Sequence, residues 1–305
     1  MSAARMQNTV GVIGLGIMGG AMATNLLAAG FKVIGYDLAP AARRALKRAG
    51  GVAARSGADV ARRAGIVITS LPTVAALAAV SDEIARAKRG DLVVVETSTM
   101  PLEAKQAARA IVERSGVTLL DCPLSGTGAQ ARTKDLLVYA SGARSAYRQC
   151  VPLFEGFARG HHYLGAFGNG SKMKYVANLL VAIHNVAAAE AMVLARKAGL
   201  DLAQTLKVIG DGAGSSRMFQ VRGPMMVRDD YSDATMKVEV WQKDMHIIGE
   251  YATQLGCPTP LFAATAPLYT AAIAEGFAKE DTGSVCAVLG AMAGLERRTR
   301  RRSKP

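Results

Sequence analysis

Short runs of apolar, β-branched residues alternate with amphipathic stretches over the first half of the chain. The runs that predict strands are Val10–Ile13, Lys32–Tyr36, Ile66–Ser70, Leu92–Glu96, Thr118–Asp121 and Leu136–Ser141. Between them, apolar residues recur at helical spacing over Met18–Ala29, Ala41–Arg48, Val74–Lys88 and Leu102–Ser115. Because buried strands that alternate with crossover helices form parallel sheets, this half predicts an α/β fold with a Rossmann-type, doubly wound parallel sheet.

The strand pattern ends at Gly170. From Ser171 to Ala198 the apolar residues follow one uninterrupted helical period, and Gly199 is a typical residue to end such a helix. The rest of the chain also has a helical pattern, with breaks expected at Gly210–Gly214, Gly223–Pro224 and Cys257–Pro260. We therefore expect an all-α C-terminal domain that is reached through a long interdomain helix.

The composition is typical of a globular protein, since half of the 305 residues are apolar and a fifth are charged. The four cysteines show no C-x-x-C spacing, so we expect unpaired thiols in a reducing, cytoplasmic environment. Residues 1–8 have no apolar core, and we expect no signal peptide. The apolar stretch Leu179–Ala195 is interrupted by His184, Asn185 and Glu190, which predicts a buried helix and not a membrane span.

The net charge of +13 is unevenly distributed along the chain. The last ten residues hold six basic residues and one acid, a contribution of +5 that leaves +8 for residues 1–295. Such a tail can bind nucleic acid or a membrane surface, but the simpler interpretation is a solvated, disordered tail. The remaining charge suits small anionic ligands, and we expect no nucleic-acid partner.

A glycine motif, Gly14-x-Gly16-x-x-Gly19, follows the first predicted strand and opens a predicted helix. This is the context that a dinucleotide-binding fingerprint requires. The first glycine allows a tight turn, the second lets backbone approach a pyrophosphate, and the third lets the helix pack closely on the strand. The free N–H groups at the helix start would then bind the phosphates. The residues expected to contact the cofactor are Gly14, Leu15, Gly16, Ile17, Met18 and Gly19.

An acidic residue, Asp37, follows the second predicted strand about twenty residues beyond the fingerprint. A carboxylate there accepts hydrogen bonds from the adenosine ribose and repels a 2′-phosphate, which favours NAD over NADP without excluding NADP. Arg43 and Arg44 leave the alternative open, because either could turn back onto a phosphate. Their simpler interpretation is a solvated helix face.

Two hydroxyl-rich segments, Thr69–Thr73 and Thr97–Thr99, lie where predicted strands end. Open α/β sheets bind ligands at the carboxyl ends of their strands, so we expect Leu71, Pro72 and Thr99 to contact the cofactor. The alternative for the hydroxyls is helix N-capping by Thr73 or Thr99, which is compatible with binding.

Three further segments suggest catalytic chemistry: Asp121–Gly128, Gly165–Asn178 and Lys243–Asp244. Together with the glycine fingerprint, and in this order, they resemble the β-hydroxyacid dehydrogenase family. Its members include 3-hydroxyisobutyrate dehydrogenase, tartronate semialdehyde reductase and 6-phosphogluconate dehydrogenase. The resemblance covers the chain from Thr9 to about Leu295.

The resemblance implies an oxidoreductase that moves a hydride between NAD(P) and a small anionic β-hydroxyacid. It makes Lys174 the general acid/base, and it makes Asn178, one helical turn further on, the residue that orients the amine or the substrate. A lysine can do this only if its pKa falls toward neutrality, which burial and nearby positive charge promote. Substrate contacts are expected from Ser125, Gly126 and Thr127 as well as Lys174 and Asn178, and a cofactor contact from Lys243.

The domain boundaries follow from the two patterns. We expect residues 1–165 to form the dinucleotide-binding domain and residues 166–295 a helical domain for substrate binding and oligomerisation, similar to the C-terminal domain of 6-phosphogluconate dehydrogenase. Residues 296–305 are expected to form the basic tail. A long apolar helix needs more cover than one small domain supplies, so we expect a homodimer or homotetramer.

Each site residue also has a structural alternative. Lys174 could be a surface lysine with a buried stem, Asn178 a packing amide and Ser125 a turn residue. Lys243 and Asp244 could be an ordinary exposed pair. The alternatives for the whole chain are an imine or semialdehyde reductase on the same scaffold, or a non-catalytic NAD-binding interaction protein.

The sequence departs from the usual family pattern near the substrate pocket. Thr127 stands where a second glycine is common, and Ala177 precedes Asn178 where a second asparagine is common. Both differences border the expected substrate pocket, so they affect the size of substrate that we expect and not the type of reaction. Arg217 or Arg222 could bind a second anionic group of a larger substrate, or have a structural role at a helix break. The four histidines show no metal-binding spacing, and we expect no metal.

Overall fold

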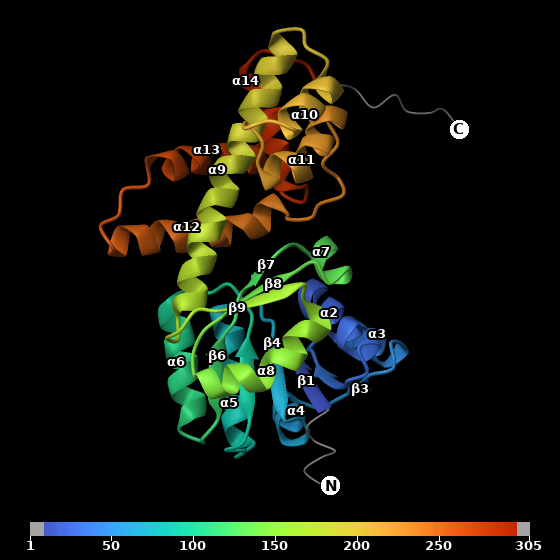
Figure 1. Ribbon diagram of the computed structural model, residues 1–305, viewed down its shortest axis with the longest axis vertical. Coiled ribbons are helices and arrows are strands. Elements are labelled where there is room, and N and C mark those ends of the chain that lie inside the picture. Colours follow the sequence, from blue (N-terminus) through green and yellow to red (C-terminus); the bar gives the residue numbers. More distant parts are fainter. Residues whose placement is uncertain (1–8, 298–305) are drawn as a thin grey trace. The chain divides into compact units, whose positions relative to one another are not determined.

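The computed structural model describes residues 9–297, and the chain divides into two compact units, residues 1–174 and 175–305. The first unit is built on a six-stranded parallel sheet with the strand order β3-β2-β1-β4-β5-β6 (Figure 1). Its strands are β1 (Thr9–Ile13), β2 (Lys32–Tyr36), β3 (Val52–Ala53), β4 (Ile66–Thr69), β5 (Val93–Glu96) and β6 (Thr118–Asp121). The order reverses between β1 and β4, which confirms the Rossmann-type doubly wound sheet.

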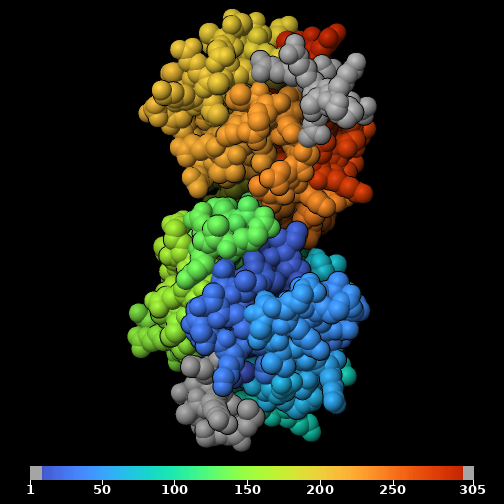
Figure 2. All heavy atoms as spheres, turned by 90° about the vertical axis from the view of Figure 1, so that its right-hand side faces the viewer, coloured from blue at the N-terminus to red at the C-terminus, as the bar shows by residue number. Residues whose placement is uncertain are grey.

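Alternate residues of the strands face two separate cores. Val93 and Val95 of β5 pack on the side that holds the helices Ile17–Ala28 and Arg144–Phe157, whereas Val94 packs on the side that holds the three helices within residues 57–113. Both faces are therefore covered, which explains the nearly continuous apolar strands. On the face drawn in Figure 2, the green segment around residue 130 lies beside the dark blue start of this unit, where Asn25 Nδ2 donates to the carbonyl of Ala131 at 2.7 Å. The helices of this unit are α2 (Ile17–Ala28), α3 (Pro40–Arg48), α4 (Gly57–Arg63), α5 (Val74–Arg86), α6 (Leu102–Glu113), α7 (Gly128–Arg132) and α8 (Arg144–Phe157).

The last predicted strand does not belong to the parallel sheet. The structure places β8 (Leu137–Ala140) in a second sheet, antiparallel to β7 (Leu124–Ser125) and parallel to β9 (Gly160–Tyr163). The expectation of one continuous sheet was wrong here because the chain between β7 and β8 holds only the short helix α7. A parallel crossover needs a dozen or more residues, usually a longer helix.

The described part of the second unit is helical apart from one isolated bridge between Lys237 and Asp281. Its elements are α9 (Asn169–Lys197, which begins in the first unit), α10 (Leu202–Gly210), α11 (Arg217–Arg228), α12 (Val238–Gln254), α13 (Pro260–Ala274), the 3-10 turn η1 (Thr282–Ser284) and α14 (Val285–Met292). The expected break at Gly223–Pro224 is absent, because α11 continues through both residues. A Cβ on Gly223 would lie 2.3 Å from Leu206 Cδ1, so this glycine serves close packing of α10 and α11.

Helix α9 confirms the long predicted helix, and one of its faces is buried. Ala182, Asn185, Ala189 and Met192 lie in the interior of the second unit, where Asn185 Nδ2 donates to the hydroxyl of Tyr269 at 3.0 Å. By length and composition alone α9 could also cross a membrane, with 39% of its apolar window buried. The buried face of α9, with the hydrogen bond between Asn185 and Tyr269, is typical of a helix in a protein core.

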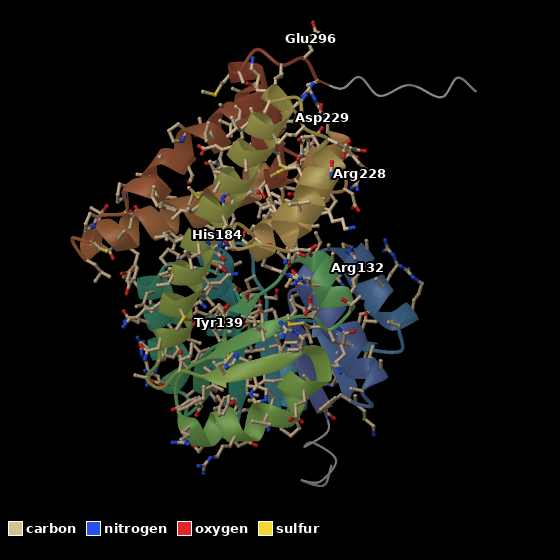
Figure 3. The ribbon with its side chains drawn as sticks, turned by 45° about the horizontal axis from the view of Figure 1, so that its top comes forward. Arg132, Tyr139, His184, Arg228, Asp229 and Glu296 are labelled. Carbon is tan, nitrogen blue, oxygen red and sulfur yellow. The ribbon has the colours of Figure 1, made fainter. Side chains whose placement is uncertain are left out.

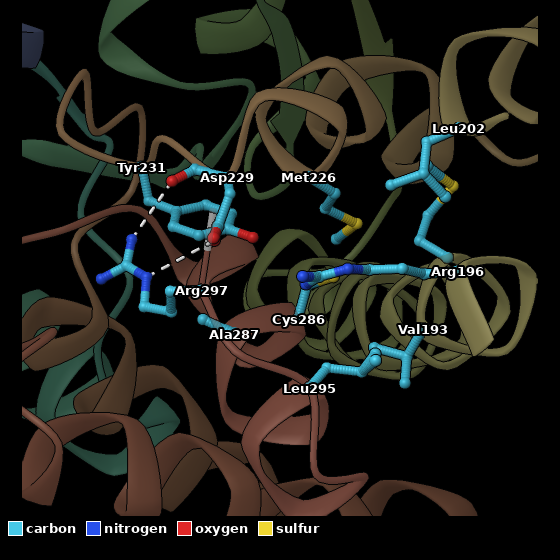
Figure 4. Close-up of a pocket in the computed structure, with 12 residues that line it drawn as sticks. Val193, Arg196, Leu202, Met226, Asp229, Tyr231, Cys286, Ala287, Leu295 and Arg297 are labelled. Carbon is cyan, nitrogen blue, oxygen red and sulfur yellow. Dashed lines mark hydrogen bonds and ion pairs between the residues drawn. The ribbon is translucent and has the colours of Figure 1, made fainter. Parts of the chain in front are cut away.

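The structure also describes the four cysteines and the first two residues of the predicted tail, Glu296 and Arg297. All four cysteines are free thiols, as expected, and only Cys257 is exposed. At the end of the described chain, Arg297 pairs with Asp229 at 3.6 Å (Figure 4). The backbone carbonyl of Glu296, a residue labelled in Figure 3, accepts from Arg196. The predicted disordered tail otherwise falls on residues 298–305, outside the described residues.

Candidate active site

The glycine loop has the geometry that the fingerprint predicts. Gly14 has a φ of +89°, and a Cβ there would lie 2.1 Å from the carbonyl oxygen of Ser70. A Cβ on Gly19 would lie 1.8 Å from the Gly14 carbonyl oxygen, so Gly19 allows α2 to start against the loop. A Cβ on Gly16 would meet no atom within 4 Å. The open side of the loop at Gly16 therefore fits the approach of a pyrophosphate.

Helix α2 leaves its N-terminus free for an anion. Gly16 is the N-cap, no side chain caps the helix, and the first turn, with Ile17, Met18 and Gly19, has no acidic residue. Unsatisfied N–H groups and the helix dipole then favour a negative group at this end. The residues present fit the phosphates of a dinucleotide.

The carboxylate of Asp37 lies against the same loop. Its Oδ2 accepts a hydrogen bond from the backbone N–H of Leu15 at 2.7 Å, and its Oδ1 accepts one from Ala39 at 2.7 Å. Arg43 donates to the backbone carbonyl of Asp37 at 2.6 Å and lies over the Tyr36 ring. Arg43 therefore does turn back toward the end of β2, but there it binds protein groups.

The loops after β4 and β5 are tied together. The backbone N–H of Leu71 donates to Ser98 Oγ at 2.8 Å, and Thr97 Oγ1 donates to the carbonyl of Thr69 at 2.7 Å. Thr73 caps α5 through Ala76, as the capping alternative predicted. Thr99 does not cap α6, because the N-cap of that helix is Pro101. Thus Leu71, Pro72 and Thr99 belong to two loops that the structure joins at the carboxyl edge of the sheet.

The expected substrate loop runs from β7 into α7. Gly126 has a φ of +130°, and a Cβ there would lie 2.6 Å from Leu136 Cδ2, so this position requires glycine. Thr127 is the N-cap of α7, and its backbone N–H donates to Gln130 Oε1 at 3.0 Å. Thr127 stands where a second glycine is common in the family, and its place as the N-cap of α7 explains this difference. Ser125, in β7, is half-buried beside this turn.

The start of α9 approaches the sheet closely. A Cβ on Gly170 would lie 2.3 Å from the carbonyl oxygen of Tyr139 and 2.7 Å from that of Asp121. Lys174 and Asn178 follow on the same helix, one turn apart, and both are buried, at 9% and 5% exposure. A lysine is rarely buried to this extent, so Lys174 does not match the alternative of a surface lysine.

In the second unit, Asn178 is hydrogen-bonded to an acidic residue that the sequence interpretation left without a role. Asn178 Nδ2 donates to Asp244 Oδ2 at 2.9 Å, and Lys243 lies 3.4 Å from Asp244 Oδ1. Asp244 is buried whereas the Lys243 side chain is 40% exposed. The adjacent Lys-Asp pair was the only sequence signal for Asp244.

Other candidate ligand groups are placed elsewhere. Arg222 is buried, and its Nε donates to Asp281 Oδ1 at 2.9 Å, so its role is structural and the suggested contact with a substrate anion is wrong for this residue. Arg217 is exposed at the start of α11. Within residues 9–297 no group of three or more His, Cys, Asp or Glu side chains could hold a metal ion.

Two cavities of the second unit contain none of the predicted site residues. One of about 20 Å³, lined by residues such as Met226, Tyr231 and Cys286, has room for roughly one water (Figure 4). Another of about 240 Å³ is lined by residues such as Ser215, Phe219 and His184 of α9, which is labelled in Figure 3. Neither is a candidate for the active site.

Comparisons with known proteins agree with this geometry. Residues 9–166 match the family described as the NAD binding domain of 6-phosphogluconate dehydrogenase. Residues 168–289 match the family described as NAD-binding of NADP-dependent 3-hydroxyisobutyrate dehydrogenase. The two matches together cover nearly all of the described chain.

Curated relatives and solved structures point the same way. An L-threonate dehydrogenase of Cupriavidus necator is 34% identical over 92% of this chain and 95% of its own length. The human mitochondrial 3-hydroxyisobutyrate dehydrogenase is 30% identical over 90% of this chain and 85% of its own. The solved 3-hydroxyisobutyrate dehydrogenase of Mycobacterium tuberculosis has a TM-score of 0.84 at 28% identity, covering 92% of this chain and 98% of that one.

Proposed function

This chain belongs to the β-hydroxyacid dehydrogenase family of NAD(P)-dependent oxidoreductases, and we propose that it oxidises a small β-hydroxyacid with Lys174 as the general base. The observation that carries the proposal is a buried lysine in the second turn of α9, one turn before a buried asparagine. Burial disfavours the ammonium form of a lysine, and a base that works near neutral pH needs that effect.

Each residue has a defined task in the proposed reaction. When bound, NAD supplies the hydride acceptor for the carbinol carbon of the substrate. Lys174 Nζ takes the hydroxyl proton in oxidation and returns it in reduction. Ser125 and the backbone at Gly126 bind the substrate carboxylate, and Asn178, held by Asp244, orients the substrate hydroxyl.

The substrate class is a small carboxylic acid with a hydroxyl at the β-carbon. The relatives act on L-threonate and 3-hydroxyisobutyrate, which share that unit and differ in the number of hydroxyls. Purified protein is incubated with NAD or NADP and each of L-threonate, 3-hydroxyisobutyrate, glycerate and 4-hydroxybutyrate, while nicotinamide absorbance is followed. We expect NAD reduction with at least one β-hydroxyacid, and the absence of NAD and NADP reduction across this panel would contradict the proposal.

Asp37 is proposed to select NAD over NADP, because its carboxylate lies at the glycine loop where the adenosine ribose binds. Asp37→Asn keeps an oxygen that can accept from Leu15 but removes the charge. Since juxtaposed like charges cost several kcal/mol, we expect the kcat/KM ratio of NADP to NAD to rise about tenfold or more. Lys47→Gln, at an exposed position in the last turn of α3, serves as the control. An unchanged ratio in Asp37→Asn would show that the carboxylate does not select the cofactor.

The exposed face of α9 is proposed to form a homo-oligomer. Met173, Leu180 and Leu194 are all exposed and stand at multiples of seven residues along the helix, with Val176 beside them. This spacing is that of a seam between two packed helices, and a second copy of α9 would present the same seam. The proposed occupant is therefore α9 of another subunit, in a dimer or tetramer.

Leu180→Glu should dissociate the oligomer, because it places a charge in the apolar seam. Sedimentation velocity at micromolar concentration is expected to show wild-type dimers or tetramers and a variant shifted toward monomer. Val208→Glu, on the exposed side of α10, is the matched control and should sediment like the wild type. A monomeric wild-type protein would refute the proposed seam.

A further inference from the structure

Three charged side chains of the first unit form a fully buried cluster. Lys105 Nζ, from α6, lies 2.7 Å from Glu96 Oε2 at the end of β5 and 2.8 Å from Asp121 Oδ1 at the end of β6. All three side chains have 0% exposure. Removing such ions from water costs several kcal/mol each, and apolar residues often stabilise a core as well. This buried triad therefore calls for an explanation other than stability.

The Lys105 ammonium is stabilised by the two acidic side chains beside it. Burial lowers the pKa of the Lys105 ammonium, but the charges of Asp121 and Glu96 and the hydrogen bonds to both outweigh burial. The net pKa of Lys105 lies above its usual range. The ammonium therefore serves as a link between the side chains of Glu96 and Asp121.

One end of the triad holds the proposed cofactor loops. Glu96 Oε1 accepts the backbone N–H of Ser98 at 2.9 Å. Ser98 Oγ in turn accepts the backbone N–H of Leu71 at 2.8 Å. The side chain of Glu96 therefore fixes the loop after its own strand and, through Ser98, the loop after β4.

The other end of the triad holds the first turn of α9. Asp121 Oδ2 accepts the backbone N–H of Ser171 at 2.8 Å, and Asp121 Oδ1 accepts the Ser171 hydroxyl at 2.8 Å. Ser141 Oγ accepts the N–H of Gly170 at 2.9 Å and donates to Asp121 Oδ2 at 3.2 Å. A carboxylate at a helix N-terminus is also favoured by the helix dipole. Asp121 thus caps the helix that carries Lys174, three residues after Ser171.

Asp121 also lies close to the substrate loop along the chain, because Ser125 follows it by four residues. We propose that Lys105, Glu96 and Asp121 form a positioning unit that sets Lys174 relative to both the cofactor loops and the substrate loop. This inference rests on the proposed function of Lys174. All contacts involved lie within residues 71–174, in the first unit. Because all three side chains are fully buried, the proposed effect on the reaction is indirect.

A pair of matched variants separates positioning from stability. Ser171→Ala removes one hydroxyl that donates to the buried Asp121, and Thr235→Val removes one hydroxyl that donates to the buried Asp281 at 2.7 Å. Misplacing a catalytic group by about 1 Å can cost 10²-fold. We expect kcat to fall about tenfold in Ser171→Ala, with its pH profile displaced, and to stay within about twofold of wild type in Thr235→Val. Equal kcat and pH profiles in both variants, measured well below their melting temperatures, would overturn the proposal.

A second measurement does not depend on turnover. The double variant Glu96→Gln with Lys105→Met removes the ammonium and the Glu96 charge while leaving the Asp121 carboxylate with its donors from Ser141 and Ser171. The rate of Lys174 acetylation by acetic anhydride, followed by peptide mass spectrometry as a function of pH, reports the position and basicity of the amine directly. We expect the rate of Lys174 acetylation at a given pH to change at least threefold in the double variant and in Ser171→Ala. In Thr235→Val the rate should stay as in the wild type. An unchanged profile overturns the positioning unit. If the wild type instead shows no turnover that depends on Lys174, the proposed function fails while this assay still decides the positioning.

Discussion

Replacement of Lys174 by alanine is expected to lower kcat for β-hydroxyacid oxidation by about 10³-fold, the middle of the range for loss of a general acid/base. The reason is that no other amine follows the glycine turn at a buried position of α9: Lys172 is exposed. The Kd for NAD should change by less than roughly threefold, because an interaction made with the reacting hydroxyl does not contribute to cofactor binding. Stopped-flow absorbance and fluorescence titration measure the two quantities.

Lys172→Ala is the matched control for this prediction. It removes an identical amine two residues earlier, on an exposed position of the same helix. Its kcat should stay within about twofold of the wild type, as is usual for surface substitutions. A kcat for Lys174→Ala within tenfold of the wild-type value would exclude the general-base role.

Asp281→Asn is expected to destabilise the second unit by about 3–5 kcal/mol, the typical cost of breaking one partner of a buried ion pair. Asp281 has no solvent exposure, pairs with Arg222 at 2.9 Å, and accepts the backbone N–H groups of Thr235, Met236 and Gly283. An asparagine side chain has one acceptor oxygen and no charge, so it cannot accept from all of these N–H groups and also pair with the Arg222 guanidinium. Urea unfolding measures the loss, and Asp211→Asn, at the exposed end of α10, should stay within about 0.5 kcal/mol of wild type.

The contribution of Asp281 should depend on pH with a defined sign. Burial raises the pKa of this carboxyl, but the Arg222 charge and the hydrogen bonds from Gly283, Thr235 and Met236 lower it more, and the net pKa lies below the usual 3.8. The stabilisation is therefore complete above the unfolded pKa of about 3.9 and is lost as pH falls toward the folded value. The difference in unfolding free energy between wild type and Asp281→Asn should shrink below about pH 4. A difference that stays constant through that range would contradict this account.

Much of the fold was predictable because its signals are local. Strands such as Lys32–Tyr36 lie at the predicted residues, since apolar runs bounded by turns fit a fully covered sheet. The glycine loop followed from its spacing. What local patterns missed depended on tertiary packing. Helix α11 continues through Pro224 because it packs on α10, and β8 joins β7 and β9 because the intervening chain is too short for a parallel crossover.

The candidate site likewise has a part that local sequence patterns predicted and a part that depends on tertiary packing. The helical periodicity placed Lys174 and Asn178 on one helix, and the structure shows both buried there. The partner of Asn178, Asp244, is 66 residues away, and its carboxylate had no role in the sequence interpretation. The buried triad was missed entirely, because Lys105 meets residues from two strands and a capped helix that no sequence spacing connects.

The most direct test of the central claim is the pH dependence of hydride transfer in a single turnover, measured for wild type and Lys174→Ala with NAD and the acid that supports turnover. If Lys174 Nζ takes the hydroxyl proton, the wild-type rate rises with pH as the amine loses its own proton, and this limb is absent from the residual rate of the variant. If the same limb persists in Lys174→Ala, another group takes the proton and the proposed mechanism is wrong.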